Sequence, residues 1–163
     1  MESVSVEFAK YAEVLAYDKD TGLMTWKVRR GCRASGQRAG SPKSDGYLEL
    51  KAFGKSTLVH RVAWLLVTGN WPKFDIDHLN GIRSDNRLCN LRDVPVSINT
   101  QNQRKARSDN TTGFLGVSVH PKGFLAQIML AGKMHKLGVH KSASEAHSTY
   151  LIAKRQMHSG CTI

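Results

Sequence analysis

The sequence predicts an α+β fold that is divided into two small domains. Short runs with the alternation of strands are interspersed with stretches whose apolar residues recur at helical spacing. A polar, turn-rich segment, Ser108–Gly113, separates this mixed first part from a second part with three strand-like runs and one helix. A length of 163 residues suffices for one ordinary domain or two very small ones. We therefore expect one domain over residues 1–107 and another over residues 108–163.

In the first domain, strand and helix signals alternate. An amphipathic helix is expected over residues 3–17, with five candidate buried side chains: Val6, Phe8, Tyr11, Val14 and Leu15. Further helices are expected over residues 61–68 and about 97–107. The segments with strand-like patterns are residues 23–28, 47–52, 57–59, 74–78 and 91–94. Residues 29–44, rich in Gly, Ser and Arg, are expected to form a basic loop or arm.

In the second domain, glycine-containing turns separate three strand-like runs, which cover residues 115–120, 124–130 and 134–140. Ser142 and Glu145 have the spacing of a capping box and open a helix that is expected to reach about His158. One stripe of this helix is expected to be buried: Ala146, Tyr150, Ala153 and Met157. The pattern predicts a small three-stranded antiparallel sheet plus one helix.

The charge of the chain is strongly positive and unevenly placed. Lys and Arg number 24 against 13 Asp and Glu, a net charge of +11. Such an excess on a short chain indicates a polyanionic partner, most often nucleic acid. Residues 27–43 carry six basic and no acidic side chains, and residues 103–163 carry nine against two, whereas residues 44–102 are nearly balanced. From charge alone, a merely soluble basic protein remains the alternative.

Cysteine usage and hydropathy narrow the class of protein. Cys32, Cys89 and Cys161 are far apart and form no pair with metal-ligand or disulfide-framework spacing. This spacing predicts reduced thiols and a cytoplasmic location. No run reaches the roughly 18 apolar residues of a membrane span, and no secretory leader is recognised. We expect neither a membrane partner nor a small-molecule substrate.

Polar side chains are unusually dense between residues 77 and 102. The set is Asp77, His78, Asn80, Asp85, Asn86, Asn90, Asn99 and Asn102. An exposed loop is the simplest interpretation, because Asn and Asp favour turns. However, an apolar strand leads directly into Asp77 and His78, and hydrophobic residues interrupt the polar run. These features indicate a packed segment.

Such a residue set suits phosphodiester hydrolysis. A histidine can take a proton from water near neutral pH. A carboxylate and an amide oxygen can hold Mg²⁺ while leaving positions for water and phosphate. A second amide can fix the tautomer and orientation of the imidazole.

The run Ile76–Arg92 closely resembles the HNH motif of phage and intron-associated homing endonucleases. In that branch a His-x-[Asp/Asn]-Gly run is followed by Asn-Arg and Asn-Leu, as at His78–Gly81, Asn86-Arg87 and Asn90-Leu91. Asn90 and Asn99 lie 12 and 21 residues after His78, and both spacings match. The resemblance covers roughly residues 14–105. It implies a ββα-metal (His-Me finger) nuclease domain, in which two strands and a helix surround the ion.

The resemblance also implies residue roles. His78 would be the general base, and Asp77 and Asn99 would bind one Mg²⁺ or Mn²⁺ per active site. Asn90 would hydrogen-bond the ring or the backbone around His78. Asn80 is not counted as a ligand, and Asn86 is interpreted as a turn residue that stabilises the loop. His60 either contacts the scissile phosphate and shapes the site or is a packing residue, and the sequence leaves both interpretations open.

Residues 109–158 resemble the APETALA2-type (ethylene-response-factor) DNA-binding domain. The matching segments are Asn110–Val117, Ala126–Ile128, Gly132-Lys133, Leu137-Gly138 and Glu145-Ala146. The resemblance implies that the sheet enters the DNA major groove, but the base-reading Arg residues of the family are largely absent here, so the target sequence does not transfer. Across both domains, the candidate DNA-binding residues are Arg29, Arg30, Arg33, Arg38, Arg104, Lys105, Lys122, Gln127, Lys133 and Lys136.

Together these features predict a metal-dependent endonuclease that nicks or cuts double-stranded DNA, of the homing type. One active site per chain fits a monomer, and a dimer stays open. The alternative is a non-catalytic, sequence-specific DNA-binding regulator whose nuclease site has decayed. Structured RNA is a third possible target.

Overall fold

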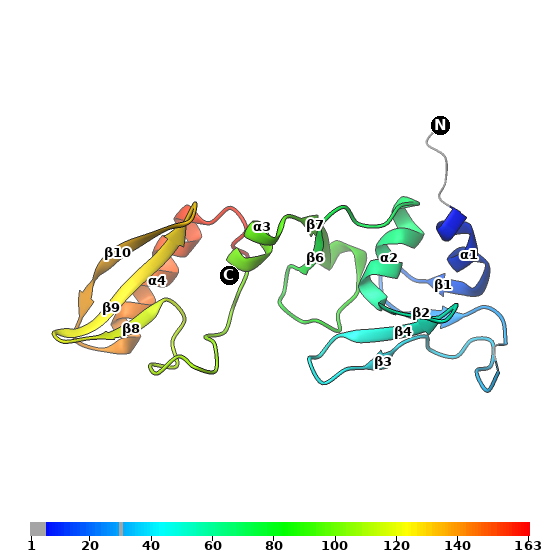
Figure 1. The fold of residues 1–163 in the computed structure, drawn as a ribbon, viewed down its shortest axis with the longest axis horizontal. Coiled ribbons are helices and arrows are strands. Elements are labelled where there is room, and N and C mark those ends of the chain that lie inside the picture. Colours follow the sequence, from blue (N-terminus) through cyan, green and yellow to red (C-terminus); the bar gives the residue numbers. More distant parts are fainter. Residues whose placement is uncertain (1–5, 30) are drawn as a thin grey trace. The chain divides into compact units, whose positions relative to one another are not determined.

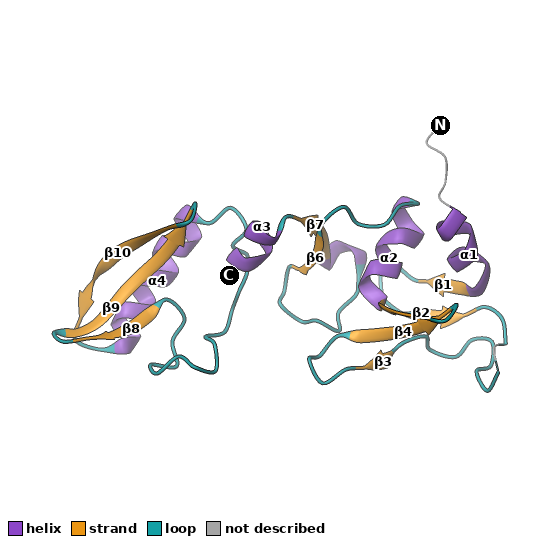
Figure 2. Cartoon of the chain, viewed as in Figure 1, coloured by secondary structure: helices purple, strands orange, loops and turns teal. Residues whose placement is uncertain are grey.

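A computed structural model describes residues 6–29 and 31–163 (Figure 1). The chain divides into two compact units, one ending at Pro95 and the other beginning at Val96. Each unit combines helices with small antiparallel sheets, so the expected α+β class is confirmed (Figure 2). The division lies earlier than the boundary that was expected between residues 107 and 108.

The segment after Pro95 belongs with the second unit because it bonds to the C-terminal end of the chain. The Gln101 side chain accepts a hydrogen bond from the Gly160 N–H at 2.9 Å. Arg104 Nη2 donates to Thr162 Oγ1 at 2.8 Å, and the buried Lys154 ammonium donates to the backbone carbonyl of Gln103. These partners are distant in sequence, so no local pattern could indicate where the division falls.

Three antiparallel sheets are described in the first unit. They pair β1 (Leu15–Tyr17) with β2 (Met24–Trp26), β4 (Leu48–Ala52) with both β3 (Ser41–Pro42) and β5 (Lys55–Leu58), and β6 (Asp75–His78) with β7 (Leu91–Val94). Two α-helices, α1 (Val6–Val14) and α2 (Val59–Thr68), accompany them, and a short 3₁₀ turn, η1 (Leu88–Asn90), precedes β7.

Helix α2 supplies the centre of the first core. Its apolar residues at helical spacing, Val59, Val62 and Leu65, are fully buried and belong to one cluster with residues of β1, β2 and β4. Ile76 of β6 and Leu91 of β7 belong to the same cluster. The β6–β7 pair is therefore anchored to the core of the unit, which fixes where β6 ends.

Two expectations for the first unit need correction. The first helix ends before the expected residue 17, because Leu15 leaves it to pair with Trp26 in β1, and Val6 is 86% exposed. Residues 3–5 of this expectation lie outside the described residues. The basic arm is partly ordered, because Trp26 N–H donates to Gln37 O at 2.9 Å and Ala39 N–H donates to Met24 O at 2.7 Å. A pattern of Gly, Ser and Arg contains no signal for such pairing with a distant strand.

The second unit has the expected sheet and helix. Strands β8 (Val117–His120), β9 (Gly123–Leu130) and β10 (Lys133–His140) form an antiparallel sheet in the order β10-β9-β8. Helix α4 (Ala143–Met157) covers one face, and Ser142 Oγ caps it by accepting from the Glu145 N–H at 3.2 Å. Ala146, Tyr150 and Ala153 are buried as expected, whereas Met157 is 37% exposed. Helix α3 (Val96–Gln101) ends six residues before the expected residue 107.

No helix among the described residues is both long enough and apolar enough to cross a membrane. Cys32, Cys89 and Cys161 all carry free thiols.

Candidate active site

His78 is the last residue of β6, where the strand runs into the loop that returns to β7. Ile76, Asp77 and His78 are all buried, so this strand is covered on both faces rather than on alternate residues. His78 stands opposite Leu91 and Asp77 stands opposite Arg92 on β7. The strand pair thereby brings a carboxylate and an imidazole to one end of a core element.

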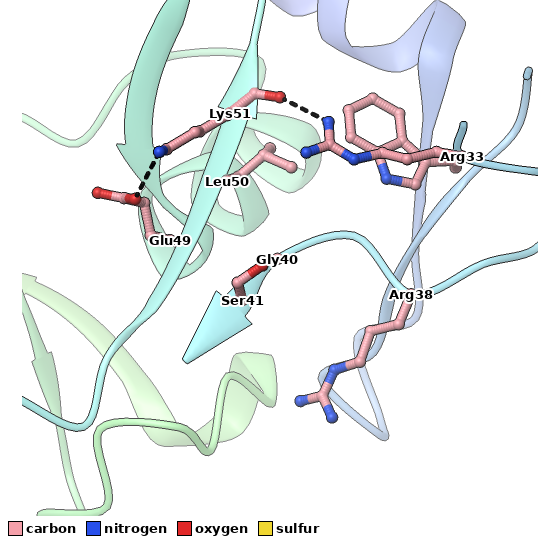
Figure 3. Close-up of a pocket in the computed structure, with 8 residues that line it drawn as sticks. Arg33, Arg38, Gly40, Ser41, Glu49, Leu50 and Lys51 are labelled. Carbon is pink, nitrogen blue, oxygen red and sulfur yellow. Dashed lines mark hydrogen bonds and ion pairs between the residues drawn. The ribbon is translucent and has the colours of Figure 1, made fainter. Parts of the chain in front are cut away.

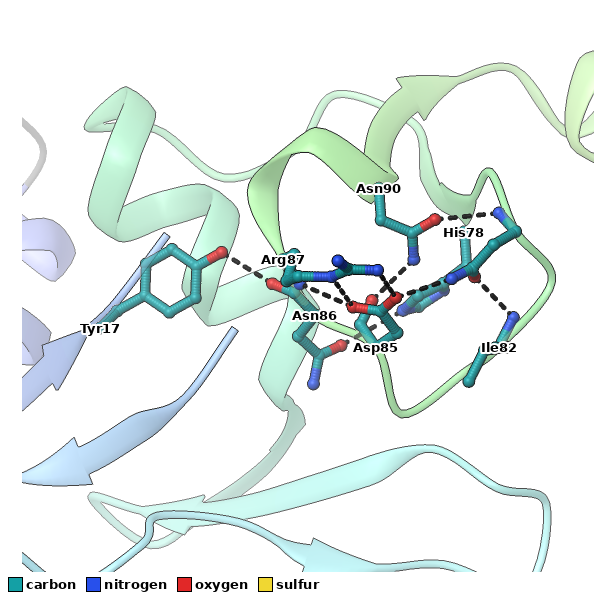
Figure 4. Close-up of polar contacts among 8 residues, drawn as sticks. Tyr17, His78, Ile82, Asp85, Asn86, Arg87 and Asn90 are labelled. Carbon is teal, nitrogen blue, oxygen red and sulfur yellow. Dashed lines mark hydrogen bonds and ion pairs between the residues drawn. The ribbon is translucent and has the colours of Figure 1, made fainter. Parts of the chain in front are cut away.

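The His78 ring contacts the side-chain amide of Asn86, which the sequence had led us to interpret as a turn residue that stabilises the loop. His78 Nε2 and Asn86 Oδ1 are 3.2 Å apart, and both side chains are buried (Figure 4). Burial lowers the pKa of His78, and the hydrogen bond to Asn86 opposes this only in part. The ring is therefore neutral at neutral pH, the form that can accept a proton.

Two aromatic rings pack on His78. The His60 and His78 centroids lie 5.0 Å apart, nearly edge to face, and Tyr47 lies 5.2 Å from His60 and 5.8 Å from His78. His60 is 4% exposed, and burial lowers its pKa to about 3, with further lowering from His78 and Arg61. A ring that is neutral at pH 7 cannot attract a phosphate by charge. His60 is thus part of the wall around His78.

Asn90 holds the loop rather than the ring. Its Oδ1 accepts from the Asn80 N–H at 2.9 Å, and its Nδ2 donates to the Asp85 carbonyl at 2.7 Å (Figure 4). The Asp85 carboxylate accepts from Asn80 Nδ2 at 2.6 Å and from Arg87 Nε at 2.8 Å. The bonds from Arg87 are the main reason that the pKa of Asp85 falls to about 2. The polar loop is therefore a bonded scaffold around His78.

Asp77 is paired with a cation across the strands. Its Oδ2 accepts from Arg92 Nε at 2.9 Å and from Arg92 Nη2 at 2.7 Å, and its side chain is 7% exposed. The pairing follows from the β6–β7 register, which places the two residues opposite each other.

The donor groups at this site determine which kind of divalent cation could bind there. Within the described residues, no group of three or more His, Cys, Asp or Glu side chains is placed to hold a metal ion. That donor set does not fit a closed zinc site. Mg²⁺ commonly uses one or two carboxylates and completes its shell with water and substrate phosphate. The single carboxylate of Asp77 fits this water-rich mode.

Asn99 lies on α3 and belongs to the second unit, so it is not among the residues that the first unit brings together. Its backbone carbonyl accepts from the Asn102 N–H at 3.0 Å. Its role as a metal ligand remains a prediction.

Some of the candidate DNA-binding residues of the first unit line a pocket of about 250 Å³ beside β3 and β4 (Figure 3). The Arg33 guanidinium stacks over Trp26, 5.3 Å from the ring centroid, and donates to the Lys51 carbonyl at 3.3 Å. Arg38 lines the same pocket, and Arg29 is exposed. Arg30 lies outside the described residues.

The candidates of the second unit occupy three places. Gln127 and Lys136 are register partners, and because Ala126 and Ile128 face α4, they lie on the opposite face of the sheet. Lys133 begins β10, and Lys122 lies in the turn before β9. Arg104 and Lys105 line a pocket of about 450 Å³ that also includes Phe114 and His147.

Sequence reasoning missed Tyr47, left the role of His60 open, and interpreted Asn86 only as a turn residue. Asn86 is one of several asparagines in a polar loop, and nothing in its spacing separates the one that faces the ring from the others. His60 and Tyr47 come from α2 and from the segment before β4. Only the packing of those elements against β6 brings them to the site.

Comparison with known proteins supports a nuclease. Residues 57–101, which run from β5 to α3 and include Asp77, His78, Asn90 and Asn99, match a family model described as HNH endonuclease. No curated protein and no solved structure matches the chain. The match supports a nuclease in general, for which DNA is the expected substrate.

Proposed function

We propose that this protein is a metal-dependent endonuclease that cleaves double-stranded DNA. One observation carries the proposal. A buried, neutral histidine follows a buried carboxylate at the end of β6, inside the segment that matches the HNH endonuclease model. Burying the polar side chains of Asp77 and His78 lowers the stability of the folded state, so their burial together favours a catalytic role over a purely structural one.

In the proposed reaction, His78 takes the proton of the attacking water. The wall of His60 and Tyr47 keeps the ring in place, and Asn90 holds the loop that follows it. Asp77 would be a ligand of one Mg²⁺ or Mn²⁺, and the ligand role of Asn99 and the ββα-metal fold are carried over from the resemblance of the motif. When bound, the cation supplies positive charge for the phosphate and for the leaving 3′ oxygen.

Both units would contribute to DNA binding. Arg29, Arg33 and Arg38 would supply basic contacts from the first unit, and the second unit would supply others through its APETALA2-like sheet. The homing type follows from the resemblance of the motif region. A monomer that nicks one strand at a time is the simplest arrangement for one site per chain.

Plasmid cleavage tests the proposal. Purified protein is incubated with supercoiled plasmid and Mg²⁺ or Mn²⁺, with EDTA and the His78→Ala variant as negative controls. The exposed Asn70→Ala variant serves as a matched positive control. We expect nicked or linear plasmid from wild type and Asn70→Ala, and none with EDTA or His78→Ala.

Two results would overturn the proposal. Cleavage that survives His78→Ala removes the mechanism. Binding of DNA without cleavage under either metal favours the non-catalytic regulator. A parallel reaction with structured RNA identifies the third candidate if RNA alone is cut.

A further inference from the structure

Asn86 is the amide that reaches the proposed general base. It is 2% exposed, and its Oδ1 lies 3.2 Å from His78 Nε2. We infer that Asn86 is a positioning residue that keeps the His78 proton on Nε2, and that the β1–β2 hairpin holds Asn86 in place for this purpose. The inference rests on the proposed function of His78 and extends it to residues outside the motif.

The tautomer follows from the chemistry of the two groups. In a neutral imidazole one ring nitrogen donates a hydrogen bond and the other accepts. An amide oxygen only accepts, so a bond to Asn86 Oδ1 requires the proton on Nε2. The lone pair is then on Nδ1, which becomes the nitrogen that takes a proton from water.

The other end of the Asn86 side chain argues against a purely structural role. Asn86 Nδ2 is buried and has no hydrogen-bond partner in the part of the chain that the structure describes. An asparagine that only stabilises a loop generally uses both ends of its amide, as Asn90 does here. Asn86 instead uses the end that fixes the histidine.

The backbone of Asn86 is fixed by a hairpin that is far away in the sequence. Tyr17 Oη donates to the Asn86 carbonyl at 2.7 Å, across 69 residues of chain (Figure 4). The Leu88 N–H donates to the Lys19 carbonyl at 2.9 Å. These two bonds tie the segment that carries Asn86 to the end of β1 and to the turn after it.

The lack of a side chain at Gly22 allows the hairpin to approach the Asn86–Arg87 peptide closely. Its φ is +73°, and a Cβ at this position would lie 2.6 Å from Arg87 N and 2.7 Å from Asn86 C. Both are backbone atoms, which cannot rotate away as the end of a flexible side chain can. Any side chain at residue 22 must therefore push the Asn86–Arg87 peptide away from the hairpin.

The tautomer is tested directly by ¹⁵N NMR of the His78 ring in the full-length, metal-free protein at about pH 8, where histidine is neutral. The His78→Gln spectrum assigns the signals. We expect a protonated Nε2 and an unprotonated Nδ1 in wild type and in Asn86→Asp, which keeps an acceptor oxygen. We expect a mixture of tautomers in Asn86→Ala. A wild-type ring protonated on Nδ1 overturns the inference.

This measurement is independent of nuclease activity. If plasmid is not cut but the Nε2–H tautomer is found and is lost in Asn86→Ala, the proposed function fails and the role of Asn86 stands. If plasmid is cut but the tautomer does not depend on Asn86, the inference fails and the nuclease stands.

Kinetics test the hairpin. Gly22→Ala is compared with Gly54→Ala, which has a similar φ of +74° but open space around it. Tyr17→Phe removes one bond without adding atoms, should Gly22→Ala prove too unstable. We expect Gly22→Ala and Asn86→Ala to lower kcat by roughly 10- to 100-fold with KM for plasmid little changed, as for other residues that orient a reactive group. Unchanged kcat in Gly22→Ala and Tyr17→Phe, or an equal loss in Gly54→Ala, overturns the role of the hairpin.

Discussion

At the scale of single residues, the site joins groups that are costly to bury. His60 and His78 are buried in contact with each other, and burial lowers the pKa of both rings. Asp77 is buried beside the Arg92 guanidinium. Desolvated polar groups destabilise the folded state unless they are paired, so their retention beside one another favours a catalytic purpose.

His60 predicts a pH dependence of folding. Its pKa is about 3 in the folded protein against 6.5 ordinarily. Between these values the unfolded chain binds the proton and the folded protein does not, so stability falls as pH drops below 6.5. From about pH 7 to about pH 4.5, wild type should lose roughly 2–3 kcal/mol more than His60→Gln. Urea unfolding at both pH values measures the difference, and equal losses would contradict the burial of a neutral His60.

The ion pair between Arg92 and Asp77 predicts that replacing Arg92 lowers the stability of the fold, and that removing the charge of Asp77 restores it. Arg92→Leu takes the guanidinium from the buried Asp77 carboxylate, and such a change costs on the order of 3–5 kcal/mol. Adding Asp77→Asn removes the charge and should recover most of the loss. Urea unfolding of wild type, the two single variants and the double variant gives the free energies of unfolding for a double-mutant cycle. Simple additivity of the two losses would show that the ion pair does not matter.

At the scale of elements, α4 and its sheet depend on one close approach. Gly116 stands just before β8 with a φ of +75°, and a Cβ there would lie 2.1 Å from Tyr150 Cδ2. Tyr150 is buried on α4, so its ring has little room to move. The absence of a side chain at residue 116 lets the tyrosine close the core of the second unit.

Gly116→Ala and Gly132→Ala form a matched pair. Both residues have similar positive φ, +75° and +77°, but nothing lies within 4 Å of a Cβ at Gly132. Each substitution costs about 1–2 kcal/mol of backbone strain. Gly116→Ala should cost roughly 1–3 kcal/mol more, because it overpacks the core. Hydrogen exchange of the Ile128 amide in β9 reports the second unit alone, and equal protection in both variants would refute the close approach.

Elements with strong local signals were predictable. The capping box at Ser142 and the stripe of Ala146, Tyr150 and Ala153 located α4, since a helix spacing and its cap are both properties of nearby residues. The two-residue strand β3 was not predictable, because so short a segment has no period and its pairing depends on β4.

In the candidate site, too, only features with a local sequence signal were predictable. Asp77 and His78 were assigned from the resemblance to the HNH motif, supported by the strand that leads directly into them. Asn86 and Asn90 are chemically identical and lie in the same loop. Which amide faces the ring depends on the path of the chain, and that path is set by Tyr17 and Gly22, far away in the sequence. No spacing rule within the loop contains this information.

At the scale of the whole molecule, positive charge is distributed between the two units. Residues 103–163 carry nine basic and two acidic side chains, whereas the site region is nearly balanced. Phosphate contacts release counterions from DNA, so the number of contacts sets how steeply affinity falls with salt. The salt dependence of binding therefore measures how much of this charge touches DNA.

Neutralising four lysines of the second unit should flatten that dependence. In the full chain, Lys105, Lys122, Lys133 and Lys136 are changed together to Gln, and Lys19→Gln in the hairpin turn of the first unit is the control. Each lost phosphate contact lowers the slope of log K against log salt by roughly 0.9, so the quadruple variant should lose about 3–4 units of slope, and the control none. Fluorescence anisotropy with duplex DNA over a salt series gives both slopes. An unchanged slope in the quadruple variant would mean that the second unit does not grip DNA through these cations, and would leave the first unit as the binding surface.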